Sequence, residues 1–369
     1  MTTGTDFLRD SFKRLSFSEI FPGYFDIIKR YWWLIVSIGL LFGWLLSFPL
    51  QGPLFFTLLE KTGLNTEFCG SLFMIGHIAG LLLGGIAGLL MGRYLDWLAG
   101  GAIICQVVTL LIPFSVQETW ATLFLSMGFF AGLAVISWVT RFSLEVPPEH
   151  RSRTFILGAI LANIIVYLTS ITLDLGINPN FLSVLLSLLP LAMPFLFLRN
   201  PRTLTPSQPA SPSAISGERT EGLLTRAANT GIILFFVLLI YTVAGIVYYY
   251  IASNIVQTGN LLKYLGLIPY LIFLPAAGVM GDYFARRGNA ICGALFIGIG
   301  FLLVSLFKGS AQFILFQIFL IGGYAFLDTF TWVIGADFFS KRNQSIGYGL
   351  ILGVNMTAIL LGNLAGYRL

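Results

Sequence analysis

The chain has 369 residues and a net charge of +5, and 57% of its residues are hydrophobic while only 10% are charged. Soluble domains carry about 25% charged residues, so a soluble enzyme, a disordered protein and a fibrous protein are excluded. The composition instead predicts an all-α polytopic membrane protein, with the lipid bilayer as its main partner.

Residues 1–30 form a charged segment before the first long apolar run. Phe7, Leu8, Phe12 and Leu15 recur at helical spacing, with basic residues between them. This pattern is typical of an amphipathic helix on the cytoplasmic membrane surface; a frayed polar tail is the alternative. The segment lacks the apolar core of a cleavable signal peptide.

Eleven apolar runs follow, each close to the ~20 residues that a helix needs to cross a bilayer. They cover about 31–51, 68–91, 99–115, 119–139, 154–174, 180–198, 230–252, 262–280, 289–307, 311–333 and 345–366. The gap 199–229 is rich in Pro, Ser, Thr and Arg, which predicts a flexible linker. We therefore expect a first bundle of six spans over 31–198 and a second bundle over 230–369 with five visible spans.

The basic residues predict the orientation of the chain. If the N-terminus is cytoplasmic, 17 of the 21 Lys and Arg residues fall on the cytoplasmic side, and four lie outside. Cytoplasmic loops carry an excess of Lys and Arg, so the predicted location is the plasma (inner) membrane with the N-terminus in the cytoplasm. Charges placed in this way indicate topology and give no sign of direct nucleic-acid binding.

The sequence shows no pattern for catalysis or for a cofactor. Cys69, Cys105 and Cys292 lie far apart, without the spacing of a metal site or a disulfide framework. A phosphate-binding loop, a zinc-protease HExxH motif and a nucleophile elbow are all missing from the sequence. We therefore do not expect an enzyme, and we expect no bound metal or cofactor. We expect the protein to be a monomer.

The two halves repeat each other at an offset of about 190 residues. At this offset Gly88 falls on Gly278, and Arg151 falls on Arg342. A parallel repeat of two bundles is the plan of many transporters. The sixth span would recur near 371–389, beyond the last residue, so either the sequence is part of a longer chain, which we expect, or the protein has eleven spans.

A loop pattern in both copies resembles the major facilitator superfamily, whose loops after the second and eighth spans read G-x-x-x-D-(R/K)-x-G-(R/K)-(R/K). The second copy matches at Gly278, Asp282, Arg286 and Arg287. The first copy keeps Gly88 and Arg93 but has Gly92 at the acidic position. Asp282 can face the positive N-terminus of a neighbouring span, and the two arginines can latch the cytoplasmic side; a simple turn is the alternative.

Only two ionisable side chains lie well inside predicted spans, His77 and Asp328. Such groups are costly in a bilayer and indicate function by default. Asp328 precedes Asp337 by nine residues, about 13 Å along a helix, and could carry a coupling proton or pair with a cationic solute. Alternatively, Thr329 or Thr331 satisfies it as a structural group, and His77 is a packed core histidine.

The resemblance implies that the first, fourth, seventh and tenth spans line a central cavity. The aromatic and polar candidates for solute contact on these spans are Trp44, Trp138, Tyr241, Gln317, Tyr324 and Trp332. Tyr248, Tyr249 and Tyr250 also fit an aromatic belt at the membrane surface.

The second span carries glycines at a spacing of four residues, which lets two helices approach closely. These are Gly80, Gly84, Gly88 and Gly92. The resemblance implies that this face meets the eleventh span, either as a sliding surface or as static packing.

Taken together, these features predict a secondary transporter that moves a small, weakly charged or partly apolar solute by alternating access, with protons as a candidate coupling ion. The alternative is a membrane sensor of the same fold that binds a ligand and feeds a soluble output domain. The degraded first-copy loop motivates this second reading.

Overall fold

The computed structural model describes residues 17–200, 223–258, 268–284, 286–306, 310–340 and 343–368. The regular structure in these ranges is helical throughout, which confirms the predicted all-α class. The first half contains α2 (Phe17–Ser47), α3 (Pro53–Thr62), α4 (Thr66–Met91), α5 (Gly101–Leu111), α6 (Trp120–Glu145), α7 (Arg151–Asp174), α8 (Pro179–Ser187) and α9 (Ala192–Arg199). The second half contains α10 (Leu223–Thr258), α12 (Ile268–Tyr283), α13 (Arg286–Leu306), α14 (Ser310–Phe338) and α15 (Gln344–Arg368).

Ten helices in the described ranges are long and apolar enough to cross a membrane. They match ten of the eleven predicted spans. The remaining span, 262–280, corresponds to α12, which has 16 described residues because 259–267 lie outside the described ranges. The sixth span is broken into α8 and α9 by a 3₁₀ turn, Leu189–Leu191, where Pro190 lacks the N–H that a continuous helix needs.

Several predicted boundaries need correction. The predicted amphipathic segment of residues 7–15 lies outside the described residues. Non-helical angles at Tyr31 (φ −119°, ψ 17°) divide the membrane part of α2 from its first turns. Most of the predicted linker, 201–222, is also outside the described residues, but α10 begins at Leu223, so the linker ends earlier than residue 229.

The two halves are built on the same set of helix contacts. In the first half α2 packs on α7, α4 packs on α6, and α5 packs on α6. In the second half α10 packs on α15, α12 on α14, and α13 on α14, which are the same relations one repeat later. The structure therefore agrees with the parallel repeat predicted from the sequence.

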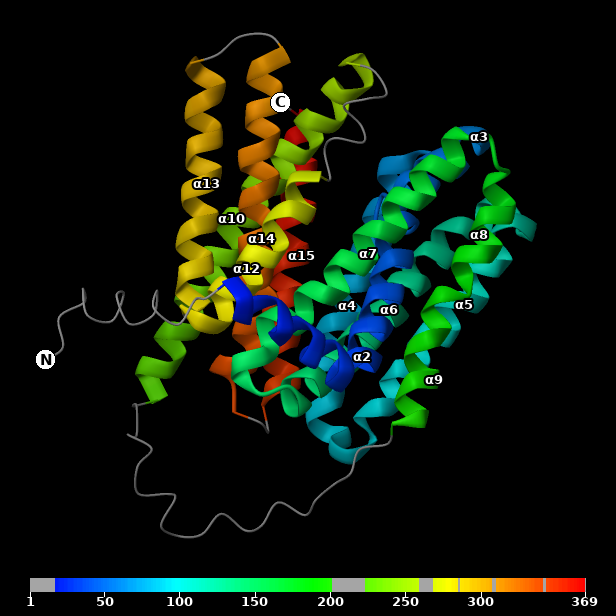
Figure 1. The fold of residues 1–369 in the computed structure, drawn as a ribbon. Coiled ribbons are helices and arrows are strands. Elements are labelled where there is room, and N and C mark those ends of the chain that lie inside the picture. The colour runs from blue at the N-terminus through cyan, green and yellow to red at the C-terminus, as the bar shows by residue number, and fades with distance from the viewer. Residues whose placement is uncertain are drawn as a thin grey trace, which may run out of the picture.

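The halves meet through α4 against α15 and through α7 against α12 (Figure 1). They approach each other at the end where α7 begins and α12 ends, and the helices diverge toward the opposite end (Figure 1). We call the first of these ends the basic end, because Arg151, Arg153 and Arg286 lie there.

The second and eleventh spans meet as expected, through α4 and α15, but Gly80 and Gly84 pack on α6 of the same half instead of on α15. A Cβ on Gly80 would clash with the carbonyl oxygen of Phe129 in α6, and one on Gly84 would touch Leu133 and Ile136. The contact with α15 is made by the next face, where a Cβ on Gly85 would lie 3.2 Å from Cα of Gly349. Neighbouring helices cover both faces of α4, so glycine spacing alone did not identify the partner.

Alanine substitutions at these glycines should separate the two kinds of packing. Gly80→Ala would place a methyl group against a backbone oxygen and should cost about 1–3 kcal/mol of folding free energy. Gly85→Ala, whose Cβ would lie 2.9 Å from the oxygen of Ser345, should instead push the halves apart at the basic end. Thermal unfolding in detergent measures the first effect, and thiol labelling of a cysteine at Ile156 measures the second.

The control is Gly298→Ala, because a Cβ there meets nothing within 4 Å. Its unfolding midpoint should equal or exceed that of the unsubstituted chain, since alanine favours a helix interior. If Gly80→Ala behaved like Gly298→Ala, the close packing of α4 on α6 would be contradicted.

Candidate functional site

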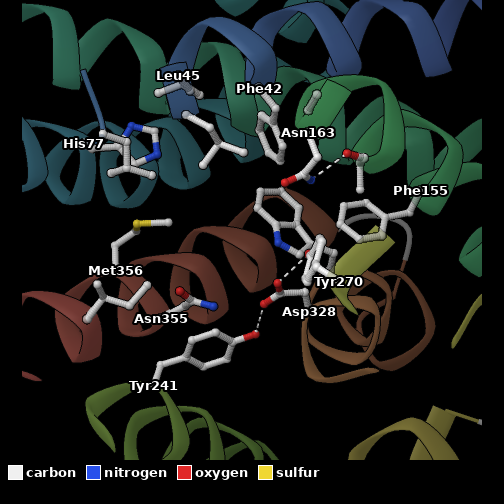
Figure 2. Close-up of a pocket in the computed structure, with 16 residues that line it drawn as sticks. Phe42, Leu45, His77, Phe155, Asn163, Tyr241, Tyr270, Asp328, Asn355 and Met356 are labelled. Atoms are coloured by element: carbon white, nitrogen blue, oxygen red, sulfur yellow. Dashed lines mark hydrogen bonds between the residues drawn. The ribbon is translucent and has the colours of Figure 1, made fainter. Parts of the chain in front are cut away.

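A cavity of about 190 Å³ lies between the two halves (Figure 2). Its walls come from α2, α4 and α7 on one side and from α10, α12, α14 and α15 on the other. The lining residues are Phe42, Leu45, Leu46, Leu50, His77, Phe155, Ala159, Ala162, Asn163, Tyr241, Tyr270, Asp328, Trp332, Asn355, Met356 and Ile359.

Asp328 is held in this cavity by two tyrosines of neighbouring helices. The hydroxyl of Tyr241 in α10 donates to Oδ1 at 2.5 Å, and that of Tyr270 in α12 donates to Oδ2 at 2.6 Å (Figure 2). Tyr241 Oη also lies 3.3 Å from Thr331 Oγ1. Thr329 bonds instead to the carbonyl oxygen of Ala325, so the two tyrosines take the place of the threonine partners considered from the sequence.

Aromatic rings from both halves meet at Trp332 of α14. Phe155 of α7 stacks on Trp332 with ring centroids 5.5 Å apart and an angle of 13°. Phe42 of α2 contacts the same ring edge-on, with centroids 4.8 Å apart. The three rings make an apolar wall that crosses the boundary between the halves.

His77 lines the first-half side of the cavity, opposite the helices that hold Asp328 (Figure 2). Its Nδ1 lies 3.3 Å from the carbonyl oxygen of Gly128, which can only accept, so Nδ1 carries a hydrogen. The ring stacks on Phe73 with centroids 5.7 Å apart. His77 is therefore both packed and accessible to a solute, and its role stays a prediction.

Four of the residues predicted to contact solute do not line this cavity: Trp44, Trp138, Gln317 and Tyr324. The indole of Trp138 donates to the oxygen of Leu34 at 3.0 Å and stacks on Phe142, which anchors it inside the first half. Trp44 is fully buried, and Tyr324 packs on Tyr241 behind the cavity wall. The side chains of Tyr248–Tyr250 lie outside the described residues.

Three further residues line the cavity and were not predicted from the sequence: Tyr270, Asn163 and Asn355. Each lies on a span outside the four that the resemblance marked as cavity-lining. Asn163 Nδ2 donates to the oxygen of Ala159 at 2.8 Å. Asn355 Oδ1 is buried and has no hydrogen-bond partner in the part of the chain that the structure describes. The one feature of the sequence that could have identified these residues is that each is a polar side chain within an apolar span.

Asp282 lies against the N-terminus of a neighbouring span, as its position in the loop pattern suggested. Its carboxylate accepts from the backbone N–H of Ser152 at 2.8 Å and of Arg153 at 3.2 Å, in the first turn of α7. The guanidinium of Arg153 also donates to it, at 2.9 Å. The carboxylate of one half thus caps a helix of the other half.

A second carboxylate extends this contact into a network. Asp337 at the end of α14 pairs with Arg151 of α7 and with Arg286 of α13. Arg286 in turn pairs with Asp282 at 3.0 Å and donates to Ser152 Oγ at 2.8 Å. These five charged side chains join the halves at the basic end, and we call them the latch network.

The other residues of the predicted gating loops have different surroundings. Gly278 is buried, and a Cβ there would lie 2.8 Å from the hydroxyl oxygen of Tyr24 and 2.7 Å from Ile156 Cδ1. Arg287 is exposed, and Gly88 is buried. Gly92 begins a 3₁₀ helix, Gly92–Gly100, but the side chain of Arg93 lies outside the described residues.

No group of three His, Cys, Asp or Glu side chains within the described ranges could hold a metal ion. The described residues thus form a cavity between the two halves that contains one carboxyl group, Asp328, and the latch network joins the halves at the basic end.

No protein-family model matches the sequence, and no curated protein matches it at a significant level. Solved structures do match. The chain is similar to XylE, a proton:xylose symporter of the major facilitator superfamily, with a TM-score of 0.68 and 15% identity over 93% of this chain and 88% of that one. It is similar to the human organic anion transporter MFSD10, with a TM-score of 0.66 and 14% identity over 90% and 91%. A double tryptophan mutant of XylE matches with a TM-score of 0.67 and 17% identity over 92% and 86%.

Proposed function

We propose that this chain, which has the fold of the major facilitator superfamily transporters, is a secondary transporter. It moves a small, weakly charged or partly apolar solute by alternating access. The observation that supports this proposal is the cavity between the halves, which has walls from both of them, together with the ion pairs that join the halves at the basic end.

The latch network gives the alternating movement a physical basis. The halves are held together at the basic end by two ion pairs, Arg151–Asp337 and Arg153–Asp282, and by close packing of α4 on α15. If these contacts break while contacts form at the opposite end, the cavity changes the side to which it opens. Both halves that wall the cavity belong to one chain, so a monomer can carry out this movement.

Asp328 is the proposed carrier of a coupling proton, because its carboxyl group can take up and release a proton in the cavity. The orientation is also proposed: the basic end faces the cytoplasm of an inner-membrane protein, in line with the excess of Lys and Arg there. His77 is a second candidate for proton transfer.

Labelling from both sides of a vesicle membrane tests this function. A cysteine at Ala159, a residue of the cavity wall, should react with an impermeant thiol reagent added on either side, because a carrier exposes the cavity to each side in turn. The native cysteines are first replaced by alanine. Glu118→Cys and Asn343→Cys, both at exposed positions, report orientation: the first should react only from outside and the second only from inside.

Labelling of Ala159→Cys from one side alone, under every solute and pH condition, would contradict alternating access. Such a result, together with solute binding, would favour the sensor. Labelling of Asn343→Cys from outside would overturn the proposed orientation without affecting the transport proposal.

A further inference from the structure

The charge of the cavity is unbalanced. Asp328 is the one acidic group among its 16 described lining residues, and neither Lys nor Arg is among them. An ionised carboxylate without a counter-charge is costly in a bilayer. A solute that supplies one positive charge would remove this cost.

The hydrogen bonds around Asp328 also favour a positively charged solute. Tyr270 directs its hydrogen at the carboxylate, so its oxygen keeps only lone pairs for a solute. The hydroxyl of Tyr241 likewise donates its hydrogen to Asp328. Asn355 Oδ1 is buried without a partner in the described part of the chain and lies on the same side of the cavity (Figure 2). The carboxylate and the two tyrosine oxygens therefore present acceptors, which a group rich in N–H donors complements.

The remaining walls suit an apolar body carrying that charge. Trp332, Phe42 and Phe155 are joined ring to ring, and aromatic faces attract cations as well as apolar groups. The volume of about 190 Å³ exceeds the ~150 Å³ of a protein cavity that holds benzene. One ring with a short charged arm fits this volume.

We infer that the cavity binds a monovalent organic cation: an amine-like head group at Asp328, Tyr241, Tyr270 and Asn355, with a single apolar ring or a chain of similar size against Trp332. This inference rests on the proposed function, because it specifies the solute of the same cavity. It also separates this chain from MFSD10, which is named an organic anion transporter.

Binding of four probes of similar size to the full chain in detergent, at neutral pH, tests the inference. Two are cations, 2-phenylethylammonium and benzyltrimethylammonium; one is neutral, 2-phenylethanol; and one is an anion, 3-phenylpropanoate. Both cations should bind about tenfold more tightly than the alcohol or the anion, the effect of one charge-assisted contact. The primary ammonium should bind the tighter of the two cations, because it donates hydrogen bonds.

Asp328→Asn should reduce the preference for cations to about twofold or less, and Glu118→Gln, an exposed acid outside the cavity, should keep it. Equal or tighter binding of the alcohol or the anion to the unsubstituted chain, or no binding of any probe, would overturn the inference. If Asp328→Asn fails to fold, the four-probe series on the unsubstituted chain still decides. If the cations bind but Ala159→Cys is labelled from one side only, the transport proposal is contradicted and the cation-binding inference is not.

Discussion

Replacing Asp282 by alanine should open the basic end of the molecule. The carboxylate is 1% exposed and its partner Arg153 is 4% exposed, so the substitution removes one member of a buried ion pair. Such a change costs about 3–5 kcal/mol, since the remaining charge is left without its partner. The first turn of α7 also loses the acceptor for two backbone N–H groups.

This cost falls on the closed arrangement more than on either half alone, because Asp282 and α7 belong to different halves. A cysteine at Ile156, which is fully buried next to Gly278, reports the change. In the chain without its native cysteines, this thiol should react slowly with a small impermeant reagent. In Asp282→Ala the reaction should be at least about tenfold faster.

Two further variants locate the cause. Asp282→Asn keeps an acceptor for the helix N-terminus but loses the charge, so its labelling rate should lie between those of the other two chains. Ser340→Ala changes an exposed residue at the same end and should leave the rate unchanged. A rate in Asp282→Ala equal to that of the unsubstituted chain would mean that the latch network is a loop contact without a gating role.

The sequence predicted the spans well because their signal is local. A run of about 20 apolar residues has few alternatives to a membrane-crossing helix, and the described helices fall close to the predicted ranges. The position of Asp282 was also predictable, because an acidic group at the end of one span meets the positive end of another in a repeated bundle.

Which faces of the helices meet was much less predictable. A membrane helix is apolar on nearly every side, so hydropathy does not distinguish the side that faces lipid from the side that faces another helix. On α4, Gly80 contacts α6 while Gly85 contacts α15, and the glycine pattern gave no means of assigning these partners. Tyr270 reaches Asp328 across 58 residues of sequence, a contact that depends on how α12 and α14 cross.

The scarcity of charge inside the membrane explains why Asp328 and His77 could be singled out, and also why their neighbours could not. An ionisable group within a span is rare enough to be noticed from the sequence alone. Tyrosine is common in this chain, with 14 residues, so nothing distinguished Tyr270 from the tyrosines expected at the membrane surface.

Replacing Asp328 by asparagine should abolish the pH dependence of transport while leaving the protein inserted and folded. Asparagine keeps the shape of the side chain, and the hydroxyls of Tyr241 and Tyr270 can still bond to its amide, one as donor and the other as acceptor. The substitution also removes a group whose ionised form costs at least ~2.5 kcal/mol in the bilayer. Detergent-solubilised Asp328→Asn should therefore unfold at a temperature equal to or above that of the unsubstituted chain.

The expected pH dependence follows from competition at one carboxyl group. A protonated Asp328 has no charge for a cation, so uptake of benzyltrimethylammonium should fall as the pH is lowered. The other titratable groups close to Asp328 are Tyr241 of α10, Tyr270 of α12 and Tyr324 of α14, with His77 of α4 across the cavity. Tyrosines do not ionise at neutral pH, which leaves His77 as the other possible source of a pH effect.

Uptake of radiolabelled benzyltrimethylammonium into reconstituted vesicles, from about pH 5.5 to 8, separates these sources. The probe is permanently charged, so its own state does not change with pH. Asp328→Asn should give a low and flat profile, whereas His77→Gln should keep the slope of the unsubstituted chain. A slope retained in Asp328→Asn and lost in His77→Gln would transfer the coupling role to the histidine, and failure of Asp328→Asn to insert would make Asp328 a structural hydrogen-bonding group, held by its two tyrosines.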